Sequence, residues 1–170
     1  GILLAGASGQ EGVNNSVYNN MVYDIRSSSV QSNSSIDGIG MWRQINPKIY
    51  YNSVYLSGNG NGANPLGSQA LAIWNNCTNV DARNNIFVNT RNESPFRASA
   101  IQISSGSSLN TSNFNDLYYS TGTNNCLVRM YGVNYNTLAE WQATGRDLNS
   151  VTDMPNFVAP DLHINNLIST

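Results

Sequence analysis

The residues best suited to binding chemistry form an aromatic set with polar neighbours. Indole and phenol rings stack on sugar rings, while amide and guanidinium groups bond sugar hydroxyls. Both kinds of group recur just after similar apolar segments of the chain, at Trp42, Arg43, Trp74, Asn75 and Tyr131. Because side chains alternate along a strand, a ring that follows an inward Met or Ile faces outward. This set is predicted to bind a glycan or a protein partner, unless a long loop such as 57–69 covers the rings.

A second aromatic set follows the apolar residue of another recurring segment. Its members are Tyr18, Tyr55, Phe87 and Tyr118. The alternation predicts that they project outward as one column on successive repeats. Stacked rings of this kind stabilise neighbouring strands by about 0.5–1 kcal/mol per pair. Structural stacking is the favoured interpretation, and a partner-binding stripe is the alternative, because a long exposed aromatic stripe is sticky.

Groups for acid–base chemistry are scattered. Asp81 and Asp116 are expected to face outward, with Arg83 close to Asp81, and two such carboxylates are the groups that polysaccharide cleavage needs. Surface salt pairing is the commoner use of such residues. Lys48 is the only Lys of the chain and either a lyase base or a solvated turn residue. The carboxylates considered fall mostly at different repeat positions: Asp24, Asp37, Asp81 and Asp116.

Residues for metal binding are few, so no metal or cofactor is predicted. Calcium prefers oxygen ligands, and one short run after residue 145 offers them, but it lacks the Gly and bidentate Glu of an EF-hand loop. An ordinary Asx-turn cluster is the alternative for this run, which comprises Asp147, Asn149 and Asp153. His163 has no partner at ligand spacing and is interpreted as structural. Cys77 and Cys126 fit no zinc spacing and are expected to be buried free thiols.

The composition limits the classes of partner. The 170 residues include 28 Asn and 21 Ser but only 11% charged residues, and the net charge is −2. A basic surface for nucleic acid is therefore excluded, and the longest apolar run is too short to span a membrane. Low charge with abundant Asn, Ser and Tyr favours an extracellular protein. Because Gly1 is not a natural start, we expect the chain to be a piece of a longer polypeptide.

Two short segments recur together and predict how these residues are positioned. Asn-Ser-Val-Tyr occurs at 15–18 and 52–55, with looser copies at 84–87 and 115–118. The alternation predicts inward residues two positions after each Asn, at Val17, Val54, Ile86 and Leu117. An apolar segment precedes each copy, and its predicted inward residues are Ile2, Leu4, Ile39, Met41, Leu71, Ile73, Ile101, Ile103, Val128 and Met130. Asn side chains at the recurring bends are expected to bond to their copies above and below.

The repeats predict a single all-β domain over 1–170, a parallel β-helix of about five coils over 1–136. Strands one coil apart and running the same way must pair in parallel, and no segment of the repeat region has the pattern of a crossover helix. Thr137 and Glu140 match a capping box and Gly145 a helix stop, so one short helix is predicted at 137–145. Residues 146–170 are expected to form an irregular closing segment.

Residues 80–89 and the tail 138–164 carry a family likeness. The chain resembles right-handed parallel β-helix proteins of the pectin-lyase-like group, and its tail is similar to the closing coils of large secreted bacterial surface proteins. The group contains polysaccharide lyases, hydrolases, tailspikes, adhesins and structural modules. No position matches a catalytic motif of the group.

The resemblance implies a non-enzymatic module of a secreted or cell-surface bacterial protein, acting as spacer, assembly or adhesion element. Its expected partner is a polysaccharide or protein surface, and the exposed strand edges at each end allow head-to-tail self-assembly. The alternative is a polysaccharide lyase or glycoside hydrolase. An enzyme of this kind that acts on an anionic polysaccharide needs a more basic groove than this chain offers.

Overall fold

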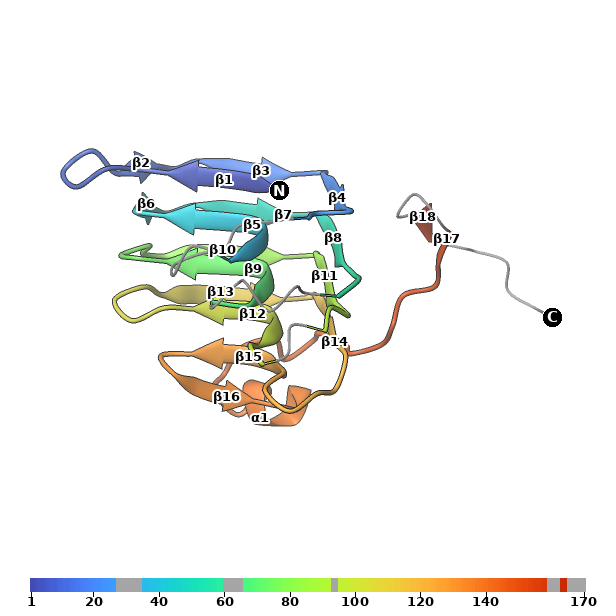
Figure 1. Cartoon of the computed structure of the whole chain (residues 1–170). Helices are drawn as coiled ribbons and strands as arrows, with labels where there is room; N and C mark the ends of the chain where they lie inside the picture. Colours follow the sequence, from blue (N-terminus) through green and yellow to red (C-terminus); the bar gives the residue numbers. More distant parts are fainter. Residues whose placement is uncertain (27–34, 60–65, 93–94, 159–162, 165–170) are drawn as a thin grey trace.

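The computed structural model describes residues 1–26, 35–59, 66–92, 95–158 and 163–164. This part of the chain is mostly β-structure, arranged in parallel sheets, with one short helix near the C-terminus (Figure 1). The all-β prediction is confirmed.

Sheet A is the largest sheet and is built from strands far apart in the sequence. Five parallel strands lie in chain order, and a sixth, β16 (Val133–Tyr135), closes the sheet in antiparallel pairing with β15. The parallel strands are β1 (Ile2–Ala5), β5 (Ile36–Trp42), β9 (Ser68–Trp74), β12 (Ala98–Ile103) and β15 (Cys126–Met130).

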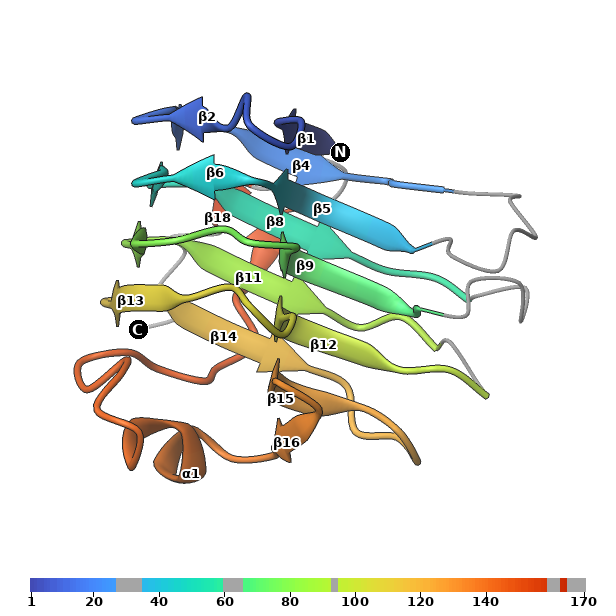
Figure 2. The same cartoon turned by 90° about the vertical axis from the view of Figure 1, so that its left-hand side faces the viewer.

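Two further parallel sheets repeat this order. Sheet B contains β3 (Ser16–Tyr18), β7 (Lys48–Tyr50), β10 (Val80–Arg83) and β13 (Leu109–Asn113). Sheet C contains β4 (Met21–Tyr23), β8 (Ser53–Leu56), β11 (Ile86–Asn89) and β14 (Asp116–Tyr119). The chain visits A, B and C in turn and then starts again one strand spacing further on, and we call each such round a tier (Figure 2). The short strands β2 (Gly12–Val13) and β6 (Gln44–Ile45) pair between the first two tiers.

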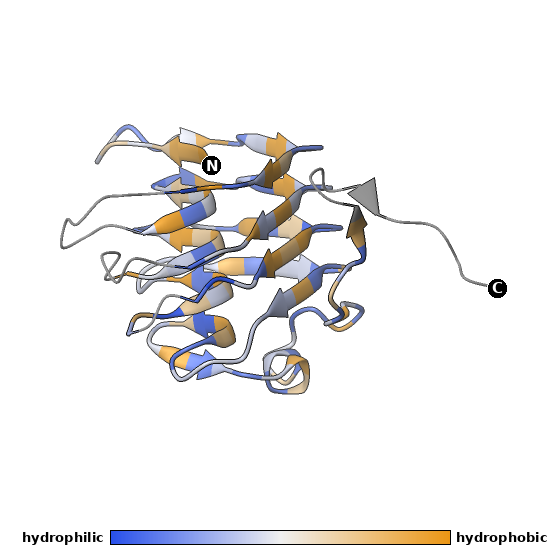
Figure 3. Ribbon diagram, turned by 45° about the vertical axis from the view of Figure 1, so that its right-hand side comes forward, coloured by the Kyte–Doolittle hydropathy of each residue, from blue (hydrophilic) through white to orange (hydrophobic). Residues whose placement is uncertain are grey.

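The predicted inward residues of the longer strands form the core of sheet A. Ile39 lies opposite Ile2 and Leu71, and the register continues through Ile101 to Val128. Ile39, Leu71, Ile101 and Val128 are fully buried in one hydrophobic cluster. Figure 3 shows apolar residues recurring on successive strands of the stack. The alternation therefore assigned this face correctly.

The prediction for the second recurring segment is wrong in part. Val17 lies in sheet B opposite Ile49, whereas Val54 lies in sheet C between Val22 and Phe87. Phe87 is fully buried, while Ile86 is only partly buried. The two copies of Asn-Ser-Val-Tyr thus belong to different sheets. Strands of sheets B and C have similar patterns and are separated by only two residues, so the same four-residue motif can occur in either sheet.

A buried ladder of Asn side chains marks the corner between sheets B and C. Asn20 Nδ2 donates to Asn52 Oδ1 at 2.9 Å, Asn52 Nδ2 to Asn85 Oδ1 at 3.0 Å, and Asn85 Nδ2 to Asn115 Oδ1 at 3.1 Å. The predicted ladder is present at positions 52 and 115, but Asn20 and Asn85 replace the predicted Asn15 and Asn84. The residue before each ladder Asn has φ of 56–57° and makes the sharp turn, at Asn19, Tyr51, Asn84 and Phe114.

An exposed Asn ladder marks the turn before sheet B. Asn46 Nδ2 donates to Asn14 Oδ1 at 3.1 Å, and Asn79 Nδ2 to Asn46 Oδ1 at 3.0 Å. All three residues have φ of 55°. Asn tolerates this left-handed conformation better than most residues, so one residue type provides both the bend and the bond between tiers.

The predicted helix forms over α1 (Leu138–Gln142), inside the predicted range 137–145. Thr137 and Glu140 make both bonds of the capping box, and Gly145 has φ of 82° just beyond the helix. Trp141 is fully buried against the core, so the helix covers the end of the last tier. No helix in the described part of the chain is long and apolar enough to cross a membrane.

The tail then runs beside sheet C to β17 (Phe157–Val158), which pairs with β18 (His163–Ile164) (Figure 1). The ring of Phe157 lies 5.4 Å from the ring of Tyr55.

Candidate functional site: the outer face of sheet A

The outer face of sheet A consists of the side chains that alternate with the core residues. Strand register aligns them in three columns that run across the strands. Column one is Asp37, Gln69, Ser99 and Cys126; column two is Leu3, Gly40, Ala72, Gln102 and Arg129; column three is Ala5, Trp42 and Trp74.

The strands of sheet A bend, and the outer face lies on the inside of the bend. Gly38 and Ile39 both face the core, since a Cβ on Gly38 would lie 2.3 Å from Val54 Cγ1. Trp74 Nε1 donates to Asp37 Oδ2 at 2.9 Å. Along a straight strand the positions of these two residues would be about 17 Å apart, too far for their side chains to meet. The bend brings columns one and three together.

The bend explains why outward positions are buried. Ala72, Gln69 and Ser99 are fully buried, and Gln102 is 5% exposed. Asp37 and Gly40 at the upper end of the face line a hollow of about 290 Å³ together with Leu3 and Ile36. Arg26 also lines this hollow, whereas Gln69, Ser99 and Gln102 do not, so the hollow is confined to the upper end of the face.

The structure brings the predicted tryptophans together. Trp42 and Trp74 are register partners in column three. Trp42 is 39% exposed, whereas Trp74 is 9% exposed because its indole lies toward Asp37. Residues 60–65 of the loop considered as a cover lie outside the described residues. Of the two rings, Trp42 is therefore the more exposed and the better placed for stacking.

The other members of the predicted set lie at the turns that leave sheet A. Arg43 N donates to Asn75 O at 3.0 Å, and both residues have positive φ. Tyr131 is 51% exposed, and its hydroxyl donates to the main-chain oxygen of Ser107. Tyr131 N also donates to Ile103 O, which places the ring two tiers below Trp74. The three side chains therefore border the outer face at its end.

Four polar atoms on this face have no hydrogen-bond partner among the described residues: Asp37 Oδ1, Gln69 Oε1, Ser99 Oγ and Gln102 Oε1. Buried polar atoms are nearly always paired, so four on one face of one sheet form an unusual group. Gln69, Ser99 and Gln102 were not predicted. Their signal is the polar residue at alternate positions of otherwise apolar strands, which is informative only once the strands are aligned.

Charges on the face differ between its two ends. Burial raises the pKa of Asp37, against the opposing effects of the Trp74 indole bond and of the Ser35 side chain. At the lower end, burial lowers the pKa of Arg97, and the charge of Arg129 lowers it further. Cys126 lies beside them as a buried free thiol, and burial raises its pKa to about 11. Cys77 is likewise buried and free, as predicted for both.

The second predicted aromatic column does not exist as predicted. Phe87 points into the core, and Tyr18 lies in sheet B opposite Tyr50. The outer positions of sheet C are instead Tyr23, Tyr55, Val88 and Tyr118. The error follows from the misassigned second segment, because a shift of one residue moves a side chain to the opposite face. Tyr55 is in contact with Phe157 of the chain's own tail.

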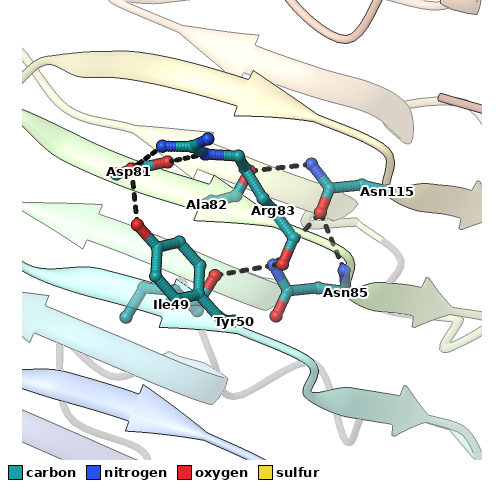
Figure 4. A network of polar contacts seen from close by, with 7 residues as sticks. All are labelled: Ile49, Tyr50, Asp81, Ala82, Arg83, Asn85 and Asn115. Atoms are coloured by element: carbon teal, nitrogen blue, oxygen red, sulfur yellow. Dashed lines mark hydrogen bonds and ion pairs between the residues drawn. The ribbon is translucent and has the colours of Figure 1, made fainter. Parts of the chain in front are cut away.

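Asp81 belongs to a polar network on the outer face of sheet B (Figure 4). Arg83 Nε donates to Asp81 Oδ1 at 2.7 Å, and the Tyr50 hydroxyl donates to Asp81 Oδ2 at 2.5 Å. Burial raises the pKa of Asp81, but the bonds from Arg83 and Tyr50 outweigh it and leave the pKa below its ordinary value. Lys48 is exposed and lies opposite Asp81 in the register. The surface salt pair considered from the sequence is present.

The candidate acid pair is not brought together. Asp81 lies in sheet B and Asp116 in sheet C. Asp24 pairs with Arg26 at 2.7 Å on the surface. Burial raises the pKa of Asp116 to about 6, and the charge of Asp153 adds to the rise although the Asp153 N–H bond opposes it.

Asp116→Asn is expected to stabilise the protein at neutral pH. The folded-state pKa of about 6 exceeds the ordinary Asp value of 3.8, so the folded state binds the proton more tightly than the unfolded state does. Ionisation therefore costs stability as pH rises through about 6, and that cost is absent below about pH 4. An uncharged Asn avoids it and still accepts the Asp153 N–H bond. Allowing for partial solvent exposure, the free energy of unfolding should rise by about 1 kcal/mol at pH 7.5.

Urea unfolding of both proteins at pH 4 and pH 7.5 measures this effect. The two curves should converge at pH 4, and an equal difference at both pH values would contradict the assignment to Asp116 ionisation.

Of the weak calcium candidates, Asp147 has its carboxylate bonded to other residues. Asp147 is fully buried, and its carboxylate accepts bonds from Trp141, Asn115 and Ser150. The main-chain N–H groups of Asn149 and Asp153 bond to other side chains. Among the described residues no group of three or more His, Cys, Asp or Glu is placed to hold a metal. His163 lies in β18, and its side chain is outside the described residues.

Comparison with known proteins returned no match to a family model, to a curated protein or to a solved structure.

Proposed function

We propose that this chain is a right-handed parallel β-helix module of a secreted or cell-surface bacterial protein, and that it binds polysaccharide on the outer face of sheet A without cleaving it. The three parallel sheets, visited in constant order, support the β-helix. The high Asn and Ser content and low charge support the extracellular setting.

One observation carries the binding proposal: Trp42 is exposed on the outer face of sheet A, and the polar residues Arg43 and Asn75 lie at the turns that directly follow Trp42 and Trp74. An aromatic ring face beside convergent polar groups is the usual arrangement for sugar recognition, with the ring taking the apolar face of the sugar. In the module so formed, the rigid stack holds these groups at fixed spacing, as adhesion to a repetitive polymer requires.

The charges favour binding over cleavage. Asp81 is held by Arg83 and Tyr50, which leaves it unavailable as a proton donor. Asp116 has the raised pKa of a general acid but lies on a different sheet from Asp81. Cleavage by two carboxylates needs both on opposite sides of one bond, within about 5–10 Å of each other.

Trp42→Ala is expected to weaken retention on immobilised polysaccharide about tenfold or more, because an exposed aromatic anchor contributes most of the energy of such a contact. The fold should persist, since the ring is 39% exposed. Affinity electrophoresis and calorimetry against a panel of soluble polysaccharides measure the effect. Trp74 is less suitable for this substitution, because its bond to Asp37 gives it a structural role as well.

Tyr18→Ala is the matched control. Tyr18 is 61% exposed on sheet B, away from the outer face of sheet A, so its removal should leave retention unchanged. Equal retention of the wild type and Trp42→Ala would refute the binding site.

A further inference from the structure

Another hollow lies at the corner between sheets B and C, apart from the outer face of sheet A. Its volume is about 410 Å³, within the size range of small-ligand sites. Next to the buried Asn ladder it is lined by three apolar residues, two exposed amides and one carboxylate: Phe114, Ile86, Val151, Asn84, Asn149 and Asp116. The hollow therefore offers both an apolar surface and accessible polar groups to a ligand.

Phe114 occupies a turn position that does not suit an aromatic residue. Its φ is 56°, in the left-handed region, which Asn enters more easily than a bulky side chain does. The same turn carries Asn in two other tiers, at Asn19 and Asn84. The ring is 54% exposed, so packing in the core does not account for it. An exposed ring that is kept in a strained conformation beside a hollow points to a binding role.

The polar groups of the lining are available to a ligand. In the described part of the chain, no residue bonds to the side-chain amides of Asn84 and Asn149. Asp116 Oδ1 accepts from Asp153 N, whereas Asp116 Oδ2 has no donor there.

The charge of the hollow is complementary to a cation. Asp116 is the only charged residue among the described residues that line it, so no Lys or Arg of the lining offsets the carboxylate. Burial raises the pKa of Asp116 to about 6, and a cationic group beside it would lower the cost of its ionisation.

We propose that this hollow binds amino-sugar units of a glycan, at a site separate from the outer face of sheet A. The apolar face of the sugar packs on Phe114, and the sugar hydroxyls bond to the amides of Asn84 and Asn149. The ammonium group of the sugar pairs with Asp116. An N-acetylated sugar has the same ring but no positive charge, so it binds more weakly.

Phe114→Asn separates a binding role from a structural one. Asn is the residue at the same turn of the preceding tier, Asn84, so the melting temperature should be unchanged or higher. Loss of the ring should weaken binding of a glucosamine oligomer about tenfold or more. A ring that served stability alone would give a lower melting temperature and unchanged affinity.

Tyr51→Asn is the matched control. Tyr51 has φ of 57° at the same turn two tiers away and is 61% exposed, but it does not line this hollow. The substitution should change the melting temperature in the same direction as Phe114→Asn and leave the affinity unchanged.

Asp116→Asn tests the pairing with the ammonium group. Asn retains an acceptor for the Asp153 N–H but removes the negative charge. With Asp116 present, glucosamine oligomers should bind about fivefold more tightly than N-acetylglucosamine oligomers, and Asp116→Asn should bind the two series equally.

The experiment is calorimetric titration with both series of oligomers, matched in length. It uses Trp42→Ala as the parent protein, so that the outer face of sheet A does not contribute, and three double variants that add Phe114→Asn, Tyr51→Asn or Asp116→Asn. Absence of binding to the parent would overturn the inference and leave the proposed function standing. Unchanged affinity in the Phe114→Asn variant, an equal loss in the Tyr51→Asn variant, or equal binding of both series by the parent would also overturn it.

Discussion

Asn85→Ala should lower the free energy of unfolding by about 3–4 kcal/mol, a large part of the stability of a domain of this size. Asn85 is 1% exposed and makes bonds to the tiers on both sides of its own. It donates to Ile49 O at 2.8 Å and to Asn115 Oδ1 at 3.1 Å, and it accepts from Asn52 N at 3.0 Å. Alanine removes the side-chain partner of Ile49 O and Asn52 N, while Asn115 Oδ1 still accepts from the main-chain N–H of residue 85. The cost of an unpaired buried group exceeds the net gain of one bond.

Asn85→Asp separates the loss of bonds from the loss of volume. The aspartate has nearly the same shape and still accepts from Asn52, but its second oxygen faces the carbonyl oxygens of Ile49 and Arg83 (Figure 4). A destabilisation as large as that of alanine is expected. Urea unfolding followed by circular dichroism measures both variants.

Asn79→Gly is the control for this comparison. Asn79 makes a similar side-chain bond to Asn46, but on the exposed ladder, where water replaces the bond. Glycine accepts the φ of 55° without strain. A loss below about 1 kcal/mol is expected, and an equal loss in Asn79→Gly and Asn85→Ala would show that burial of the ladder is unimportant.

The same ladder shows how far the sequence predicts the fold. The strands of sheet A are long enough for alternation to show which side chains face the core. The aligned inward residues from Ile39 to Val128 were therefore predictable. Strands of sheets B and C are short, and each has a single fully inward residue in its first tier, Val17 and Val22. Two short strands with the same local pattern cannot be distinguished unless the strands that pair with them are known. For this reason Asn15 and Asn84 were wrongly assigned to the ladder and Phe87 to the outer face.

Only the aromatic residues of the candidate site were predictable from the sequence. Trp42 and Trp74 follow from alternation on the long strands. Asp37, Gln69 and Ser99 depend on the bend after Gly38, where two successive residues face the core. Strict alternation excludes such a bend, so the sequence pattern gives no reason to place Asp37 near Trp74.

The site and the fold are connected through this bend. Small residues occupy the bend on three neighbouring strands, at Gly38, Ala70 and Ala100, and they let the chain approach Val54 and the core closely. A larger side chain there would push the strand outward and open the bend. The shape of the proposed binding face is therefore set by residues that no ligand would touch.

Asp147→Ala should destabilise the protein by about 3–5 kcal/mol and expose the lower end of the stack. The carboxylate of Asp147 continues the buried ladder, since it accepts from Asn115 Nδ2 at 2.9 Å. It also accepts from Trp141 Nε1 at 2.7 Å and from Ser150 Oγ at 2.5 Å. Alanine would remove the acceptor of three buried donors at one point, and only Asn115 Nδ2 keeps other partners, Ala82 O and Ser112 Oγ.

The loss should spread to the main chain that Asp147 holds in place. Asp147 N donates to Ser112 O at 2.7 Å, and Val151 N donates to Asn115 O at 2.9 Å, so residues 147–151 cover the last strands of sheets B and C. Without this cover, the edges of β13 and β14 present free main-chain groups to other chains. Asp147→Ala is therefore expected to associate as its concentration rises, which sedimentation velocity detects alongside urea unfolding.

Asp153→Ala and a chelator distinguish this role from calcium binding. Asp153 is exposed and bonds to Asp116 through its main chain, which alanine retains, so the variant should be nearly as stable as the wild type. Because three donors occupy the Asp147 carboxylate, EDTA should not change the unfolding curve of the wild type. A curve shifted by EDTA, or equal destabilisation by Asp147→Ala and Asp153→Ala, would show that a cation and not the ladder holds this end of the stack.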